Sequence, residues 1–407
     1  QTYFQSYQLA ADLARRAERC YRFEIGVQDS GYVQPGAWDN LRSGLLAGER
    51  LQLDLRRLEA AYLDQNRREL ECTKHVSLAL IAPQALLALK DTGTCVVDLP
   101  EEIFDLDYPG HYFRRIKSVS LSIPCVAGPQ TTIACTLRLL RNRVRINSAV
   151  TPQYEHNHDE GVLTDDDRFR ESHVRVKSIA TSSGQNDSGL FELNFRDERY
   201  LPFEGAGAIS TWQIELMQDR ELRQFPYETI ADVILHVRYT AREDAGNFRN
   251  EAVQHLRDVL ATAGTRMPLR RLFDLPHEFP TEWHAFFHPP AGQPRVLALP
   301  LRRDRFPFLA QGGDLQIESV SLFVRTGTTE GLVARLSPPL GDVADDEIAL
   351  PPTTEDDAFH ANRKEVGLLL DETEPWGLRL RKQSAGFDDL TEAEVVEAYL
   401  VVEYTLQ

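Results

Sequence analysis

Hydrophobic and polar residues follow a helical period through the first ninety residues of the chain. Residues 5–23 contain no Pro or Gly and are rich in Ala, Leu, Arg and Glu, which predicts a helix. One face of a second helix carries apolar residues at spacings of 4, 3 and 4: Leu51, Leu55, Leu58 and Tyr62. This pattern predicts a helix of about forty residues, from near Trp38 to about Ile81. A helix of that length needs other long helices to pack against.

After a short third helix, predicted between Pro83 and Gly93, the period changes to two near Leu99. Segments with alternating apolar residues predict half-buried antiparallel strands near residues 119–123, 133–139, 191–195, 212–216 and 233–239. Residues 247–263 return to a helical spacing and predict a helix between two β regions.

An internal echo suggests that the β regions are related. IKSVSL at 116–121 recurs as IESVSL at 317–322, and ILHVRYTA at 234–241 is echoed by YLVVEYTL at 399–406. Chance similarity of short strands is the alternative. We expect an α+β fold, with N-terminal long helices followed by two tandem antiparallel β-sandwich domains and a short linking helix. The expected parts are a long-helix, channel-associated region (1–97), a first sandwich (98–244), the linking helix (245–270) and a second sandwich (271–407).

Composition narrows the functional classes. The net charge of −17 over 407 residues argues against a general nucleic-acid surface, and the acidic excess is concentrated in residues 341–407. The five cysteines are odd in number and show no CxxC spacing, so we expect buried free thiols. The sequence shows no apolar run of transmembrane length and no signal peptide. It begins without Met and already in a helical pattern, so we expect it to be part of a longer polypeptide.

The stretch RDERYLPFEGAGAIS at 196–210 combines charges, aromatics and glycines. Its GAGA run is not a GxGxxG motif and precedes a predicted strand, which excludes a dinucleotide loop. Arginine and aromatic residues are enriched at protein interfaces. The predicted partner-binding residues are Arg196, Asp197, Glu198, Arg199, Tyr200, Phe203 and Glu204. The alternative is that Tyr200, Leu201 and Phe203 fill the end of their own sandwich.

Other candidate motifs fail on spacing. HEFPTEWHAFFH at 277–288 lacks the second histidine of HExxH and is interrupted by Pro280. The acidic loops EHNHDE (155–160) and TDDDR (164–168) lack the spacing of a calcium loop. We therefore expect no catalytic residues, no cofactor and no metal, and predict that the chain is not an enzyme. The alternative functions are a carbohydrate-binding module, using Trp212, Trp283 and Trp376, and a glycoside hydrolase.

Several long stretches resemble one family. They are LAGERLQLDLRRLEAAYLDQNRRELECTKHVSL (46–78), DYPGHYFRRIKSVSLSIPCVAGP (107–129), ATSSGQNDSGLFELNFRDERYLPFEGAGAISTWQIEL (180–216), FPYETIADVILHVRYTARE (225–243) and HEFPTEW (277–283). The chain is similar here to the C-terminal region of the A component of bacterial insecticidal Tc toxins. The resemblance is long and specific between residues 7 and 283 and thinner after about 330.

The resemblance implies a docking module of a secreted, extracellular toxin complex. In that family the A component is a pentamer that inserts a helical channel into the host membrane and translocates a toxic enzyme. Residues 1 to about 95 would be the last channel helices, and residues 100–407 would bind the B component of the B–C cocoon. The implied partners are that B component, further copies of the chain in a homo-pentamer, and the host membrane only through the full-length channel; no nucleic acid is implied.

Overall fold

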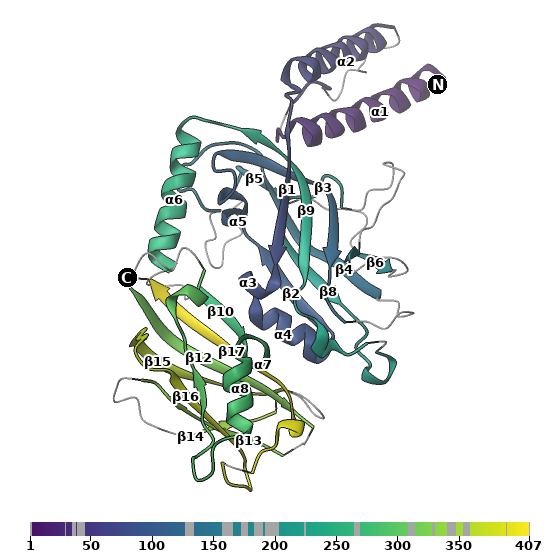
Figure 1. Cartoon of the computed structure of the whole chain (residues 1–407). Helices are drawn as coiled ribbons and strands as arrows, with labels where there is room; N and C mark the ends of the chain where they lie inside the picture. Colours follow the sequence, from purple (N-terminus) through teal and green to yellow (C-terminus); the bar gives the residue numbers. More distant parts are fainter. Residues whose placement is uncertain are drawn as a thin grey trace.

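The computed structural model describes most of the 407 residues, and Figure 1 shows its course. The described residues are 2–28, 30–34, 38, 45–126, 134–156, 166–171, 178–182, 190–191, 203–223, 225–263, 269–307, 314–327, 330–339, 347–352, 359–387 and 389–406. The α-helices are α1 (Thr2–Ile25), α2 (Leu45–Gln65), α3 (Leu78–Ile81), α4 (Pro83–Thr92), α5 (Glu101–Asp105), α6 (Asn247–Ala263), α7 (Leu275–Glu278) and α8 (Pro280–Phe287).

The strands form four sheets, and every described strand pair is antiparallel. The first two sheets contain β1 (Leu70–Ser77), β2 (Thr94–Leu99), β3 (His111–Ser122), β4 (Ala134–Arg145), β5 (Phe169–Glu171), β6 (Ser178–Ser182), β7 (Leu190–Phe191), β8 (Ile209–Glu215) and β9 (Ile234–Glu243). The other two contain β10 (Leu269–Asp274), β11 (Leu297–Leu299), β12 (Leu315–Thr326), β13 (Leu332–Ser337), β14 (Glu347–Leu350), β15 (Phe359–Leu369), β16 (Trp376–Lys382) and β17 (Val395–Leu406).

The N-terminal helices confirm the helical prediction only in part. Helix α1 covers the expected segment, and α4 begins at Pro83 and ends at Gly93 in the left-handed conformation, as predicted. The forty-residue second helix is wrong beyond Gln65, because Leu70–Ser77 forms β1 and pairs along its length with β9. Buried Cys72 and Val76 alternate there with exposed polar residues, a period of two that the charged neighbours obscure.

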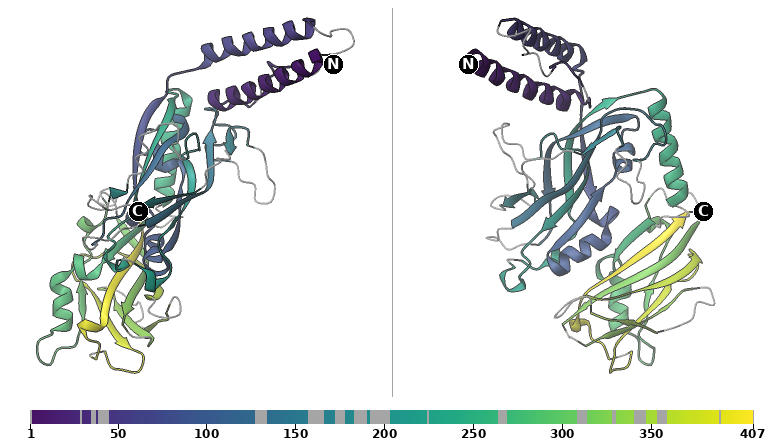
Figure 2. Two further views of the ribbon diagram at one scale, coloured as in Figure 1. Left: turned by 90° about the vertical axis from the view of Figure 1, so that its right-hand side faces the viewer. Right: turned by 180° about the vertical axis from the view of Figure 1, so that it is seen from behind.

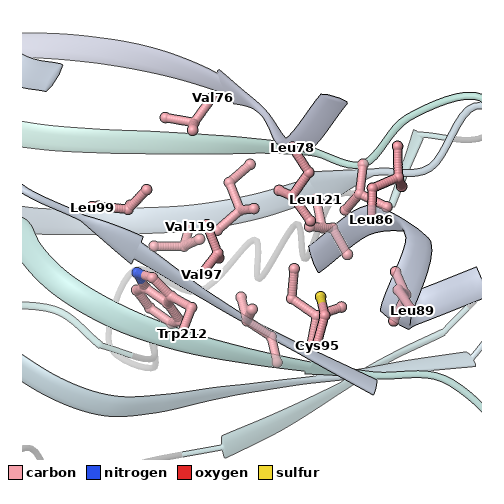
Figure 3. Close-up of a cluster of buried hydrophobic side chains, with 14 of the residues drawn as sticks. Val76, Leu78, Leu86, Leu89, Cys95, Val97, Leu99, Val119, Leu121 and Trp212 are labelled. Carbon is pink, nitrogen blue, oxygen red and sulfur yellow. The ribbon is translucent and has the colours of Figure 1, made fainter. Parts of the chain in front are cut away.

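The first two sheets, β1-β9-β3-β7 and β2-β8-β4-β5, enclose one hydrophobic core and are called here the first sheet pair. Figure 3 shows Val119 and Leu121 of one sheet facing Val97 and Trp212 of the other. Helices α3 and α4 close this core with Leu78, Leu86 and Leu89. The expectation of buried thiols is confirmed for Cys72, Cys95 and Cys135, whereas Cys20 on α1 is exposed.

The other two sheets form a second sheet pair with its own core and the same topology. Their strand orders, β10-β17-β12-β15 and β11-β16-β13-β14, match β1-β9-β3-β7 and β2-β8-β4-β5 position by position. Two short helices follow the first strand in each case, α3 and α4 in the first pair and α7 and α8 in the second. Pro83 and Pro280 begin the second helix of each unit.

The echoed sequences occupy equivalent positions in the two sheet pairs. IKSVSL lies in β3 and pairs with ILHVRYTA in β9, while IESVSL lies in β12 and pairs with YLVVEYTL in β17. Val119 faces Val237 in one register, and Val320 faces Val402 in the other. Both ladders shift register at the same point, immediately after an isoleucine of β3 or β12. The echo therefore reflects repeated structure.

Helix α6 connects the two sheet pairs, and buried charges lie where they meet (Figure 1). Lys90 on α4 contacts Glu397 at 3.1 Å and donates a hydrogen bond to the hydroxyl of Tyr399. Arg325 on β12 lies 3.4 Å from Glu397 and 3.6 Å from Asp91. These charged side chains are at most 6% exposed, so the two sheet pairs share an interface that excludes water.

Candidate functional site

Helices α1 and α2 form an antiparallel hairpin that stands away from the first sheet pair (Figure 2). Small and apolar residues hold the two helices together: Ala11, Ala14, Leu51, Tyr21, Leu58 and Ala61. The outer faces carry exposed large side chains: Tyr3, Leu9, Leu13, Leu45, Leu53 and Leu63, between 48% and 84% exposed. Among the described residues, no helix is long and apolar enough to cross a membrane. This much apolar surface is unusual for the outside of a hairpin.

Three arginines of the first sheet pair hold the end of α1, and we call this contact the helix junction. Arg242 at the end of β9 donates hydrogen bonds to the carbonyls of Ile25 (2.6 Å) and Glu24 (3.1 Å). Arg170 of β5 donates to two more carbonyls of the last turn, those of Arg22 and Phe23, both at 3.2 Å. The last carbonyls of a helix have no partner within the helix and carry partial negative charge, so guanidinium groups suit this end.

Carboxylates complete the helix junction. Arg115 of β3 lies 3.3 Å from Glu24 on α1 and 3.2 Å from Glu69 at the start of β1. Glu69 also pairs with Arg242 at 2.9 Å. Burial, together with the neighbouring Arg115, lowers the pKa of Arg170. Because both segments leaving the hairpin are tied to the same arginines, the hairpin has a fixed attachment to the sheets.

The backbone at the helix junction is tightly packed. Gly26 ends α1 with φ at +80°, and a Cβ there would lie 2.1 Å from Cε2 of Phe113. Phe113 itself has φ at +54° and is fully buried, with the guanidinium of Arg242 3.9 Å from its ring centre. A bulky residue with positive φ is strained and persists only where its surroundings fix it. Only glycine fits at position 26.

The stretch that sequence analysis singled out reaches this junction. Gly205 has φ at +78°, and a Cβ there would lie 2.9 Å from the Phe23 ring of α1. Gly207 forms an antiparallel bridge with Arg115 of β3, and its N–H donates a hydrogen bond to Oδ1 of Asn142 at 2.8 Å. A Cβ at Gly207 would lie 2.0 Å from the carbonyl oxygen of Arg143. The two glycines therefore allow close backbone approach, between the two sheets and against α1.

Most of the predicted partner-binding residues, Arg196, Asp197, Glu198, Arg199 and Tyr200, lie outside the described residues. Phe203 is 1% exposed and packs edge-on against Trp212 at 4.9 Å, with φ at +65°. It belongs to the core of the first sheet pair, so a direct contact with a partner is excluded for its side chain. Glu204 is exposed.

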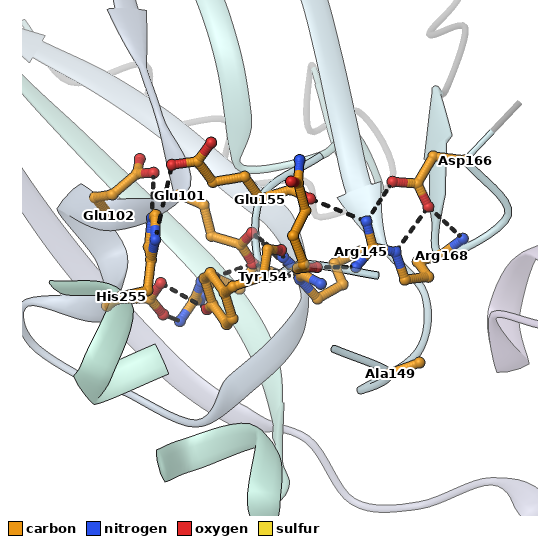
Figure 4. Close-up of polar contacts among 12 residues, drawn as sticks. Glu101, Glu102, Arg145, Ala149, Tyr154, Glu155, Asp166, Arg168 and His255 are labelled. Carbon is orange, nitrogen blue, oxygen red and sulfur yellow. Dashed lines mark hydrogen bonds and ion pairs between the residues drawn. The ribbon is translucent and has the colours of Figure 1, made fainter. Parts of the chain in front are cut away.

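A second cluster of charges is buried beside α5, as shown in Figure 4. Arg145 of β4 pairs with Glu101 at 2.7 Å, and Arg114 of β3 pairs with Asp105 at 2.5 Å. Tyr154 donates a hydrogen bond to Asp105 at 2.7 Å. Burial raises the pKa of Asp105 to about 6, although Arg114 acts in the opposite direction. Arg114 also lies 3.4 Å from Glu101, so the two arginines and two carboxylates are paired with one another, and we assign this cluster a structural role.

The remaining motifs have structural roles. In HEFPTEWH, His277 contacts Asp274 at 2.8 Å, and Glu278 pairs with Arg271, also at 2.8 Å. His284 and His288 stack on each other, ring centres 4.3 Å apart, on the exposed face of α8. Of the acidic loops, Asp166 pairs with Arg168 at 2.6 Å, while His158, Asp159 and Asp165 lie outside the described residues.

The tryptophans proposed for sugar binding are buried. Trp212 and Trp376 are 0% and 1% exposed, and Trp283 is 8% exposed. A cleft of about 230 Å³ on the outer face of the β2-β8-β4-β5 sheet is lined by charged and aliphatic residues without an aromatic. The arrangement of these side chains therefore gives no support to a carbohydrate platform.

Comparison with known proteins identifies the family. The family described as "Tc toxin complex TcA C-terminal TcB-binding domain" matches residues 1–241, which contain the hairpin, the helix junction and the first sheet pair. The chain belongs to this family. Its description names a binding domain of a toxin A component, in agreement with the resemblance read from the sequence.

Similar proteins come from Yersinia and Morganella. The chain is 37% identical over 268 residues to "Toxin subunit YenA2" of Yersinia entomophaga, covering 64% of this chain and 19% of that one. Morganella morganii TcdA4 is 26% identical over 59% of this chain and 10% of its own, with a TM-score of 0.41. Yersinia pseudotuberculosis TcaA-TcaB is 27% identical over 55% and 12%, with a TM-score of 0.36. The chain thus spans a fifth or less of these relatives.

Sequence reasoning missed the helix junction. Its residues come from positions far apart in the sequence, and an isolated arginine in a strand is ordinarily a solvated residue. One signal was available: arginines recur in β3, β5 and β9.

Proposed function

We propose that this chain docks the B component of a Tc toxin onto the channel of its A component. The family match over residues 1–241 carries the proposal, because that family is described by its TcB-binding role. The proposed work is assembly, without catalysis, at the surface of a secreted toxin complex.

The parts of the chain would divide this work. The hairpin within residues 1–97 would be the last channel helices. The elements β1, α3, α4 and β2, which begin in the same range, would complete the first of two tandem β-sandwiches with residues 98–244, and residues 245–270 would link it to the second, 271–407. The helix junction supports this division, since Arg115, Arg170 and Arg242 fix the hairpin to the first sheet pair. A fixed attachment would hold the docking surface in register with the channel axis.

Self-association of the chain would complete the docking surface for the B component. The exposed apolar faces of α1 and α2 need a partner, and a pentameric channel built from five copies would cover them. The B component, as part of a B–C cocoon, would then meet a surface made of five equivalent chains. The residues proposed to touch it include Arg196, Arg199, Tyr200 and Glu204, with Phe203 holding the segment from inside the core.

Biolayer interferometry with immobilised B–C cocoon tests the proposal. The assembled chain should bind saturably, and Arg199→Glu should weaken binding at least tenfold while leaving the melting temperature unchanged. Arg238→Glu is a matched control, because Arg238 is 57% exposed on β9, far along the chain from this segment. Failure of a folded, assembled chain to bind would contradict the docking function; equal effects of the two variants would contradict only the proposed contact.

A further inference from the structure

Three potential metal ligands from three separate elements meet beside α5. They are Glu102 on α5, Glu155 in the segment after β4, and His255 on α6. One ligand atom from each lies within 4.8 Å of the others. Nε2 of His255 is 3.0 Å from Glu102, and its Nδ1 is 3.7 Å from Glu155. Figure 4 shows the two carboxylates converging on the imidazole.

The imidazole is held in place by its surroundings. The His255 side chain is 10% exposed, and its ring stacks on Tyr154 with centres 4.8 Å apart and planes 30° apart. Tyr154 is itself fixed, because its hydroxyl donates to Asp105 and its carbonyl accepts a hydrogen bond from Arg145. Packing that orients a ligating histidine is the usual support of a protein metal site.

Among the described residues, few positively charged side chains face the cluster of Glu102, Glu155 and His255. Arg114 and Arg145 are taken up by Asp105 and Glu101, so two carboxylates share one imidazole. A histidine must be neutral to ligate a metal, and with the imidazole neutral the two carboxylates carry a charge of −2, which a divalent cation balances. One imidazole nitrogen with two carboxylate oxygens is a donor set that suits Zn²⁺, water filling the fourth position. In the structure Nε2 of His255 is hydrogen-bonded to Glu102 at 3.0 Å, and an ion bound between them would replace this hydrogen bond.

We propose that Glu102, Glu155 and His255 bind Zn²⁺. Glu155 is 60% exposed, so its side chain is free to turn toward an ion held by the other two. The ion joins α6, which leads to the second sheet pair, to α5 and the segment after β4, which belong to the first. Zn²⁺ binding therefore fixes the position of α6, the helix that leads into the second sheet pair.

Isothermal titration of the EDTA-treated chain with ZnCl₂ tests the site. A background variant, His75→Gln with His284→Gln and His288→Gln, removes two other histidine groupings: the stacked pair on α8, and the contact between His75 and His236 across β1 and β9. In this background one Zn²⁺ should bind, and adding His255→Gln or Glu102→Gln should weaken binding at least tenfold. Saturating Zn²⁺ should also raise the melting temperature of the background protein by several degrees and leave that of its His255→Gln form unchanged.

Two results would overturn the proposal. One is the absence of Zn²⁺ binding by the folded background variant up to millimolar ZnCl₂. The other is equal binding in the background protein and its His255→Gln form. If Glu102→Gln lowers the melting temperature equally with and without Zn²⁺ and binding is absent, the cluster is an imidazolium held between two carboxylates.

Discussion

The two sheet pairs share the same strand arrangement and differ in the chemistry of side chains at matching positions. In both, the strand that carries SVSL shifts register after an isoleucine, Ile116 in β3 and Ile317 in β12. The neighbouring strands with which they pair, β9 and β17, occupy equivalent positions. Each core holds a tryptophan at the matching place: Trp212 faces Val97 across β8 and β2, and Trp376 faces Leu299 across β16 and β11. Alternating apolar residues and backbone geometry are therefore what the repeat retains.

The chemistry at matching positions has diverged. Arg238 of β9 is 57% exposed, whereas its counterpart Glu403 of β17 is buried. Glu403 accepts a hydrogen bond from Ser319 at 2.7 Å and pairs with Arg270 at 2.8 Å and Arg363 at 2.7 Å. The second sheet pair therefore has a buried ionic residue where the first has a solvated one.

Residues at the strand ends differ between the two sheet pairs and make different contacts. Arg242 follows the first echo and holds α1, while the matching position of the second pair is Gln407, outside the described residues. Arg325 of β12 joins the interface between the pairs, where the first pair has Pro124. The shared strand arrangement determines the fold, and the residues that differ at the strand ends attach each sheet pair to other parts of the molecule.

The largest expected effect comes from removing the matching tryptophans. Trp212→Ala and Trp376→Ala should each cost about 3–5 kcal/mol of unfolding free energy, because each leaves a large cavity in a closed core. Hydrogen exchange should show protection lost first in the sheet pair that carries the substitution. Equal loss in both pairs from either variant would contradict two separate cores.

Arg242→Ala breaks the helix junction of the first sheet pair. It removes two hydrogen bonds to α1 carbonyls and an ion pair with Glu69, a cost of about 2–3 kcal/mol. Proteolysis within α1 and α2 should speed up while the sheets stay protected. Arg238→Ala on the same strand is the control and should change stability by less than about 0.5 kcal/mol. Similar effects of both variants would argue against a specific junction.

Gly26→Ala tests the packing at the junction. The new Cβ would lie 2.1 Å from Phe113, so the ring must move, and we expect a loss of about 1–3 kcal/mol. Gly31→Ala is a matched control, since Gly31 also has positive φ but nothing lies within 4 Å of a Cβ there. Thermal melts should rank Gly26→Ala clearly below Gly31→Ala; equal losses in the two variants would show that backbone strain alone matters.

The smallest effect is expected from a partly buried ion pair of the second sheet pair, Lys382 with Glu394. Hydrogen bonds from Lys382 and then from Thr391 lower the pKa of Glu394 from 4.5 to about 2. A lowered pKa stabilises the folded state above pH 4.5, and this contribution is lost as pH falls through about 2. Glu394→Gln should lower the melting temperature slightly at pH 7 and not at pH 2. Glu392→Gln in the same turn is the control, and a difference that persists at pH 2 would contradict the cause given.

Most of the strand arrangement that the two sheet pairs share could be predicted from the sequence. The period of two located β3, β4, β8 and β9, and the echo located the repeat, because strands buried on one face keep that alternation. Pro83 and Gly93 bounded α4 for reasons of backbone geometry. Helix α6 followed from its apolar spacing.

The rest depends on contacts that no local pattern encodes. The strand Leu70–Ser77 was predicted as helix because its exposed half is polar and follows a true helical stripe without a break. Phe203 was predicted at an interface from residue type alone, and its positive φ turns it into the core. The arginines of the helix junction gain their roles only when β3, β5 and β9 are brought together beside α1.

Docking of the B component is the central claim, and the mass of the complex tests it most directly. Light scattering during size exclusion should show the assembled chain eluting with a B–C cocoon at the mass of five chains and one cocoon. The separate masses of the two samples, from a chain shown to be folded and assembled, would contradict the claim.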